Sequence, residues 1–168
     1  MLMTKCFSSC SIISFGNQPE VKRMLKSFSR EYTGLDTLIK MDGYYYYEYY
    51  DVDRNNNTEL RITSFVFSGN GEFNRYGFFR THESLQRNIT TLKSYNGFYT
   101  VVDDTIKTKW VEKFQIGMYI LFEEYFLIEN NTALRQIRRS STRPSDGRKF
   151  ETETNNVYHF LKYSTEIK

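Results

Sequence analysis

The stretch Gly43-Tyr44-Tyr45-Tyr46-Tyr47-Glu48-Tyr49-Tyr50 carries six tyrosines in eight residues. Aromatic side chains fit the pleated, half-buried surface of a sheet, so this stretch predicts a β-strand over 43–51. Tyrosines occupy both alternating faces of that strand, which indicates that the strand is covered on both sides. Aromatic residues make up 17% of the chain, and runs of them recur as far as Tyr163.

Seven more strand-like segments follow, joined mostly by short turns. They are predicted at 59–68, 72–80, 95–103, 105–114, 117–129, 133–139 and 156–163. Tight links such as Gly69-Asn70-Gly71 and Asn130-Asn131 require antiparallel neighbours, because a parallel pair needs a long crossover. Two connections are longer: Thr81–Ser94, which suits a helical turn, and the polar segment Ser140–Asn155. The sequence therefore predicts an all-β fold, an eight-stranded antiparallel up-and-down meander barrel with a short N-terminal helix.

The domain organisation follows from the length of 168 residues, which is that of one domain. Residues 1–18 are predicted to form a flexible tail, and residues 19–168 a single barrel domain. Val21, Met24, Leu25 and Phe28 recur at helical spacing, which predicts a helix at about 20–31. Such a helix plugs the end of the barrel or packs on the sheet, or it turns its basic face to lipid headgroups.

Composition and charge exclude some classes of function. The net charge is +3 and the mean hydropathy is −0.60, so the chain is only mildly basic. Acidic residues nearly balance basic ones, and nucleic acid is therefore not an expected partner. No stretch approaches the roughly 18 apolar residues that a membrane-spanning helix needs. Nothing in the sequence indicates the oligomeric state.

Catalytic and metal-binding patterns are not found. The chain has two histidines, no zinc-protease motif, no phosphate loop and no dinucleotide fingerprint. Cys6 and Cys10 have no histidine nearby, so we expect no metal site, no cofactor and no enzymatic activity. Glu123 and Glu124 are adjacent on a strand and must point to opposite faces. One of them is expected to point into the barrel, with Arg135 as its partner.

An eight-stranded barrel is either filled by its own side chains or holds one small ligand. Trp110 shares a face with Ile106 and Thr108 while lysines take the other face, so it is predicted to point inward. A ligand would then be a small apolar or aromatic molecule held at the barrel mouth near residues 81–94. The candidate wall residues are Tyr46, Phe98, Trp110, Phe122 and Tyr125.

Two further pieces carry a family resemblance. Val101-Val102-Asp103-Asp104-Thr105-Ile106-Lys107 and the segment 125–134, with the Gly-aromatic first strand, resemble lipocalin-like (calycin) barrels, especially small secreted lipoproteins of Bacteroidetes. The resemblance implies a non-catalytic barrel that binds a small molecule at the cell envelope. The alternative is a structural or interaction lipoprotein of the cell surface with a solid barrel core.

The N-terminal region carries the sequence features that indicate where in the cell the protein works. Small residues precede Cys10 in Phe7-Ser8-Ser9-Cys10, as they precede the lipidated cysteine of a bacterial lipoprotein. The upstream apolar stretch of such a precursor is not among Met1 to Phe7. Two interpretations stay open: an exported protein attached to the envelope or outer membrane by a lipid on Cys10, or a cytoplasmic protein with an unmodified N-terminus.

Overall fold

The computed structural model describes residues 35–52, 56–91, 97–115, 118–143 and 146–163. The predicted tail at 1–18, the predicted helix at 20–31 and Cys10 lie outside these residues.

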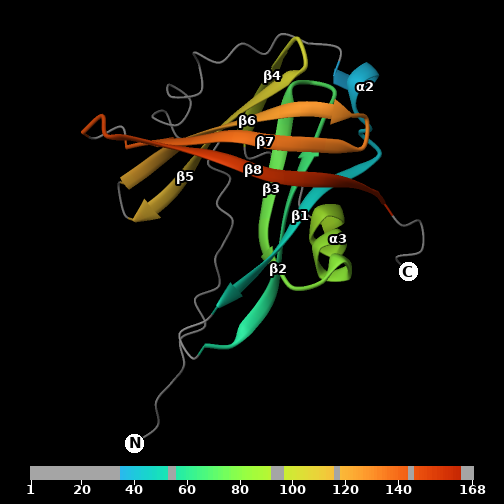
Figure 1. Ribbon diagram of the computed structural model, residues 1–168, viewed down its shortest axis with the longest axis horizontal. Coiled ribbons are helices and arrows are strands. Elements are labelled where there is room, and N and C mark those ends of the chain that lie inside the picture. Colours follow the sequence, from blue (N-terminus) through green and yellow to red (C-terminus); the bar gives the residue numbers. More distant parts are fainter. Residues whose placement is uncertain (1–34, 53–55, 92–96, 116–117, 144–145, 164–168) are drawn as a thin grey trace, which may run out of the picture.

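Eight antiparallel strands form a closed barrel in the order of the sequence, with β1 pairing with β8 to complete it (Figure 1). The strands are β1 Gly43–Val52, β2 Thr58–Phe67, β3 Glu72–Phe79, β4 Gly97–Val102, β5 Thr105–Gln115, β6 Met118–Asn130, β7 Ala133–Thr142 and β8 Lys149–Lys162. Two helices are described, α2 Leu35–Leu38 and α3 His82–Thr91. The predicted all-β barrel class is confirmed, and each of the eight predicted segments overlaps one strand.

The barrel has two different ends. At the closed end, the tight turns at 68–71, 103–104 and 130–132 gather beside α2. The Lys40 backbone N–H donates to the Asn131 carbonyl at 3.2 Å, which ties the segment after α2 to the β6–β7 turn. At the open end, β5–β8 run out in one direction and β1–β2 in another (Figure 1).

The seam between β3 and β4 is short. Among the residues that the structure describes, which leave out 92–96 before β4, only Glu72 with Phe98 and Phe73 with Gly97 are paired across it. Farther along β3, Arg75 reaches past β4, and its guanidinium carbon lies 5.4 Å from the ring centroid of Trp110 on β5. The inside of the barrel is therefore bridged by side chains where the backbone ladder ends.

Aromatic rings fill the closed half of the barrel. Phe65 lies against Phe126 with ring centroids 4.9 Å apart, and Phe67 against Tyr99 at 5.3 Å. The buried interior consists of Ile39, Tyr45, Phe65, Phe67, Phe73, Tyr99, Ile106, Trp110, Phe126, Leu134 and Tyr158. Burying an aromatic side chain of this kind contributes roughly 1.5–3 kcal/mol, so this cluster is the main source of stability.

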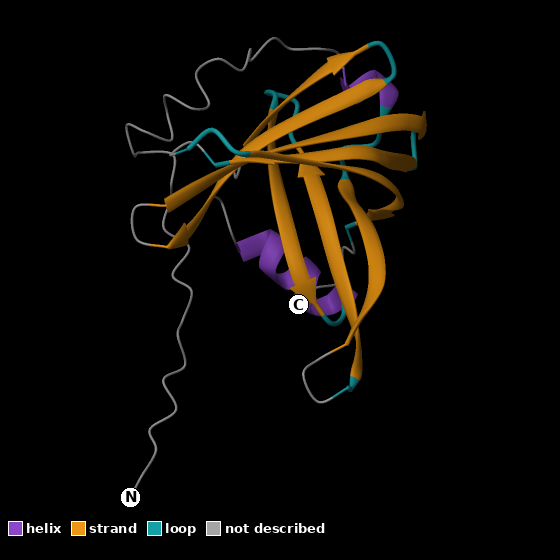
Figure 2. Cartoon of the chain, turned by 60° about the vertical axis from the view of Figure 1, so that its left-hand side comes forward, coloured by secondary structure: helices purple, strands orange, loops and turns teal. Residues whose placement is uncertain are grey.

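A second apolar cluster lies outside the barrel, where α3 covers β1–β3 (Figure 2). Leu85 and Ile89 of α3 pack against Tyr44, Ile62 and Tyr76. This explains the tyrosines on both faces of β1, because one face turns into the barrel and the next lies under the helix. The segment 81–94 was expected at the barrel mouth; its helical turn is confirmed, but α3 lies on the outer face.

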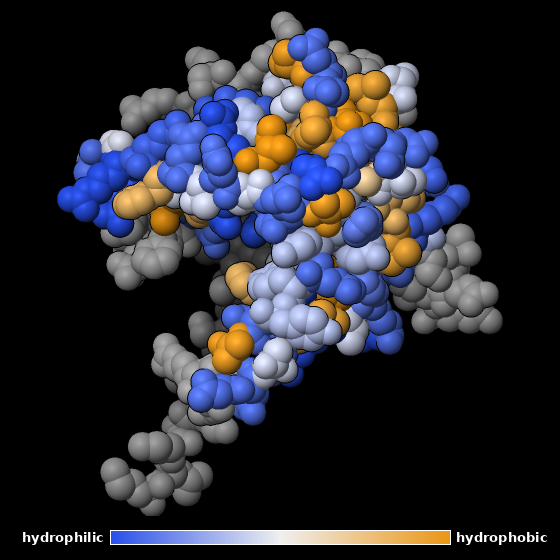
Figure 3. Space-filling view, in the orientation of Figure 1, coloured by the Kyte–Doolittle hydropathy of each residue, from blue (hydrophilic) through white to orange (hydrophobic). Residues whose placement is uncertain are grey.

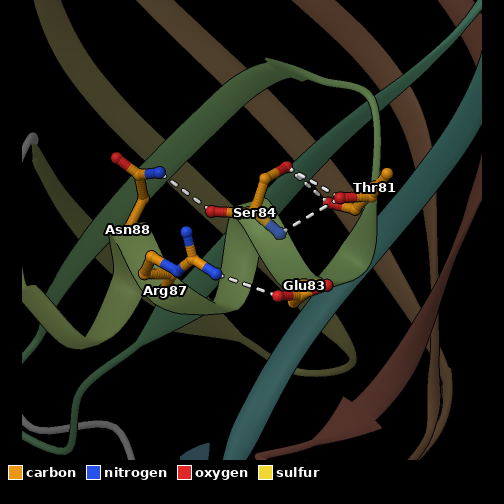
Figure 4. A network of polar contacts seen from close by, with 5 residues as sticks. All are labelled: Thr81, Glu83, Ser84, Arg87 and Asn88. Carbon is orange, nitrogen blue, oxygen red and sulfur yellow. Dashed lines mark hydrogen bonds and ion pairs between the residues drawn. The ribbon is translucent and has the colours of Figure 1, made fainter. Parts of the chain in front are cut away.

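Helix α3 begins with a capped turn (Figure 4). The Ser84 backbone N–H donates to the Thr81 hydroxyl at 3.1 Å, which satisfies one of the free donors of the first turn. Arg87 and Glu83 form an ion pair at 2.9 Å on the exposed side. The Asn88 side chain donates to the Ser84 carbonyl at 2.8 Å. The cap explains why the helix starts at His82.

The last two strands are longer than the sequence indicated. Residues 140–155 were predicted as a polar loop, but the ladder between β7 and β8 extends to the pair Thr142 and Lys149. Apolar alternation is weak there because, apart from Phe150, the residues that extend the two strands are polar on both faces. The connection is reduced to residues 143–148.

Candidate functional site at the open end of the barrel

The inner face of β5–β8 is built from cross-strand rows. One row runs from Trp110 to Phe122, Ser141 and Phe150 on successive strands. Side chains in one row point to the same side of the sheet, so these four share the concave face. Phe150, at the end of the row, is 61% exposed, whereas Trp110 is 4% exposed. The row therefore leads from the barrel interior to solvent.

The aromatic row carries a stacked pair. Trp110 and Phe122 lie 5.1 Å apart between ring centroids, with an interplanar angle of 15°. Arg75 lies over the indole at 5.4 Å and Arg139 lies over the Phe122 ring at 5.0 Å. Guanidinium groups over aromatic faces are stabilised by the ring quadrupole. The pair thus has a cation on each ring.

The neighbouring row is charged. It runs from Thr108 to Glu124, Arg139 and Thr152. The Glu124 side chain is 1% exposed, and the Nε of Arg139 lies 3.4 Å from its Oε1. Its Oε2 is buried and accepts no hydrogen bond from any residue that the structure describes. A buried carboxyl oxygen without a hydrogen-bond partner is costly to the fold, which makes this side chain a candidate functional group.

Burial has the largest effect on the pKa values of Glu124 and of the neighbouring Tyr158. Desolvation raises the pKa of Glu124, while the charges of Arg75 and Arg139 and a hydrogen bond from Gln136 act in the opposite direction. Burial also raises the pKa of the Tyr158 phenol, and the adjacent carboxyl of Glu124 adds to that effect. Perturbed groups of this kind concentrate at functional sites.

We call Arg75, Trp110, Phe122, Glu124 and Arg139 the mouth cluster. Its members come from β3, β5, β6 and β7. The space-filling view shows a hollow between the free ends of β5–β8 and the tip of β1–β2 (Figure 3). An apolar surface with a few convergent polar groups is the usual composition of a small-molecule site.

The structure separates the five predicted wall residues. Trp110 and Phe122 meet inside the barrel as a stacked pair. Tyr46 lies on the outer face, 4.5 Å between ring centroids from His82. Phe98 and Tyr125 also face outward, since Tyr99 and Phe126 beside them are buried in the interior. A ligand-binding role for any of the five stays a prediction.

The partner predicted for the inward glutamate was wrong. Glu123 and Glu124 do point to opposite faces, and Glu123 pairs on the outside with Lys107 at 3.2 Å. Arg135 pairs with Glu129 instead, its Nε lying 2.6 Å from that carboxylate. Arg139 takes the expected place of Arg135 beside Glu124.

Sequence reasoning missed the two arginines of the mouth cluster. Arg75 could have been found from alternation, because it lies two residues after the buried Phe73 on the same strand. Arg139 could not, because a bulge between Gln136 and Arg138 shifts the alternation of β7 by one residue.

A second polar set lies on the outer face under α3. The Nε2 of His82 lies 2.8 Å from Glu48, and its Nδ1 lies 3.1 Å from the Tyr44 hydroxyl. Tyr44 is fully buried, and burial raises its pKa to about 12. A phenol that is both inaccessible and hard to ionise is unsuited to act as a nucleophile, so this set joins α3 to β1.

The remaining candidates are weaker. An open depression of about 450 Å³ at the closed end is lined by Thr37, Ile39, Lys40, Met41, Asp42 and Asn131. Within the described residues, no three side chains of His, Cys, Asp or Glu gather in a way that could hold a metal ion. In the same part of the chain, no helix combines the length and apolarity needed to cross a membrane.

Comparison of the chain with protein-family models, with curated proteins and with solved structures gave no match. The closed eight-stranded antiparallel barrel is consistent with a lipocalin-like fold.

Proposed function

We propose that this protein is a non-catalytic barrel that binds a small molecule with a flat, apolar or aromatic body at its open end. The observation that carries the proposal is the stacked Trp110–Phe122 pair beside the buried carboxyl of Glu124. Both features lie on the concave face, in rows that continue to exposed residues of β8.

The chemistry of the mouth cluster supports binding. Aromatic faces give a ligand a large contact area, and a few fixed polar groups set its orientation. The closed half of the barrel is packed by rings, which leaves the open end as the place for an occupant. Two of the five residues predicted to line a ligand site, Trp110 and Phe122, form the inward stacked pair.

A structural role is the competing proposal, and one observation favours it. The described interior contains eleven buried residues in a single cluster, with partly buried residues packed around them. In that case the barrel would serve as a rigid support, and the mouth cluster would be a polar plug of its open end.

A ligand screen separates the two roles. Trp110 is the single tryptophan of the chain and lies in the proposed site, so its fluorescence reports directly on occupancy. We expect at least one flat apolar compound from a library of fatty acids, sterols, flavins and bile acids to change the emission and raise the melting temperature. A ligand at 100 times its Kd stabilises the fold by about 2.7 kcal/mol. If no compound changes either signal, the structural role is favoured.

We further propose that the protein works at the cell envelope, attached through a lipid on Cys10. The support is the pair of small residues, Ser8 and Ser9, directly before Cys10. Fractionation of the native host, with mass spectrometry of the N-terminal peptide, tests this. A cytosolic chain with an unmodified Cys10 would refute it.

A further inference from the structure

We infer that the mouth cluster binds the acidic group of its ligand, with protonated Glu124 donating a hydrogen bond to that group and Arg139 forming an ion pair with it. The inference rests on the proposed binding function. It specifies the class of ligand: a flat aromatic or apolar molecule that carries a single anionic group.

The charge balance around Glu124 favours an anion. Two guanidinium groups face this one carboxyl, Arg75 from β3 and Arg139 from β7. The other polar side chains packed around it carry no charge: Thr108 of β5, Gln136 of β7 and Tyr158 of β8, whose pKa is raised by burial. Tyr47 of β1 packs in turn against Tyr158. The group therefore carries a net charge of +1 when Glu124 is ionised and +2 when it is neutral.

The Oε2 oxygen of Glu124 supplies the hydrogen-bond donor when the carboxyl is protonated. Oε2 of Glu124 is buried without a hydrogen-bond partner among the described residues. Burial raises the pKa of this carboxyl against the effect of both arginines, so the neutral form persists to a higher pH than in an exposed glutamate. In that form a carboxyl oxygen carries a proton that needs an acceptor. A ligand carboxylate supplies the acceptor, and its negative charge favours the protonated form further.

The exposure of the Arg139 side chain indicates the side from which a ligand reaches the mouth cluster. Arg139 is 40% exposed although it touches the buried Glu124, so it joins the interior to solvent. The Phe122 ring under Arg139 continues the stack that begins at Trp110. A molecule whose flat body lies against the half-buried Phe122 brings its acidic group to Arg139 and Glu124.

Three matched probes test the inference: 2-naphthoic acid, its neutral amide 2-naphthamide, and 2-naphthyl phosphate, each titrated by calorimetry. We expect the anions to bind at least about tenfold more tightly than the amide. Whichever of the two anions binds more tightly indicates whether the natural acid is a carboxylate or a phosphate ester.

Variants assign the preference to residues. Arg139→Gln is expected to abolish the advantage of the acid over the amide. Arg138→Gln is the matched control, because Arg138 lies on the outer face with its guanidinium 3.9 Å from the Tyr125 ring. If Arg138→Gln removes the preference as Arg139→Gln does, a general surface charge is responsible and the inference fails.

The role of Glu124 is tested by proton uptake. Binding of the acid to the wild type should take up protons and weaken as the pH rises through the raised pKa of Glu124. In Glu124→Gln the side chain is always neutral, so this dependence should vanish while binding persists. The same pH dependence in wild type and variant, or none in the wild type, would overturn the assignment.

The outcomes also separate the two proposals. If the amide binds as well as the acid or better, the inference is wrong while the binding function stands. If the folded protein binds none of the three probes and nothing in the wider library, the binding function fails and the inference with it.

Discussion

Glu124 and Arg139 lie directly opposite each other across the β6–β7 ladder, with the Arg139 Nε 3.4 Å from a carboxyl that is 1% exposed. The ion pair is loose for a charge-assisted hydrogen bond, which is usually about 2.7–2.9 Å long. Burial has the larger effect on the carboxyl, and its pKa is raised despite the two arginines. Glu124 therefore reduces the stability of the folded protein whenever it is ionised.

The first prediction is a change of stability with pH. In the unfolded chain Glu124 titrates near 4.5, and in the folded chain it titrates at a higher pH. Between these two values the folded state holds one proton more, so stability falls as pH rises through that window and is constant outside it. The Glu124→Gln variant lacks this pH-dependent contribution to the free energy of unfolding. We expect the variant to gain stability relative to wild type as the pH is raised above about 4.5.

Urea unfolding of both proteins at several pH values measures this difference. Other titrating groups are common to the two proteins, so they cancel in the comparison. A difference in unfolding free energy that is the same at all pH values would contradict the buried, protonated state of Glu124.

The second prediction concerns Trp110. Because this indole is 4% exposed and stacked on Phe122, its emission should be that of a buried tryptophan and should resist quenching by iodide. Trp110→Ala should cost roughly 3–5 kcal/mol, since it leaves a cavity in a packed interior. Trp110→Phe keeps a ring against Phe122 and should cost less. Emission typical of a water-exposed indole would contradict the inward orientation.

Whether the sequence could assign a residue to the inner face depends on the residue types on the two faces of its strand. Alternation identified Trp110, because lysines mark the opposite face of its strand, but it could not separate Phe122 from Tyr125, because both faces of their strand are apolar. Tyr46 could not be assigned in the same way, because α3 buries the outer face of β1 and both faces are aromatic. Phe98 and Tyr125 fail for a related reason, since each adjoins an aromatic residue that points the other way.

The bulge in β7 explains the largest error at the site. With regular alternation Arg138 would share the inner face with Gln136, but the register shift brings Arg139 there instead. A one-residue shift moves every later side chain to the other face. No residue type in the segment signals the bulge, so the charged row becomes visible only in three dimensions.

The third prediction concerns Gly97, where β4 passes close to Trp110. A Cβ at this position would lie 2.8 Å from the Phe73 ring and 2.8 Å from the Trp110 Cβ, and closer still to the Lys109 carbonyl. Gly97→Ala should therefore destabilise the fold by roughly 1–3 kcal/mol and alter Trp110 emission. Gly69→Ala is the control, because nothing lies within 4 Å of its added Cβ. Equal losses in thermal unfolding of the two variants would contradict the close approach.

The fourth prediction concerns the attachment of α3 to β1. The tautomer that satisfies both contacts has His82 Nε2–H donating to Glu48 and Nδ1 accepting from the Tyr44 hydroxyl. His82→Ala leaves that buried hydroxyl without its acceptor, so we expect a cost of about 1–3 kcal/mol. Hydrogen exchange at Leu85 and Ile89 should accelerate, because local opening of α3 becomes easier.

A double-mutant cycle isolates this contact. Tyr44→Phe removes the hydroxyl that His82→Ala leaves unpaired, so the double variant should lose less stability than the sum of the single variants. Arg87→Ala is the matched control on the same helix, where an exposed ion pair with Glu83 is worth only about 0.3–0.5 kcal/mol. Strict additivity of Tyr44→Phe and His82→Ala would show that the two side chains do not interact, and α3 would then be held to the barrel by Leu85 and Ile89 alone.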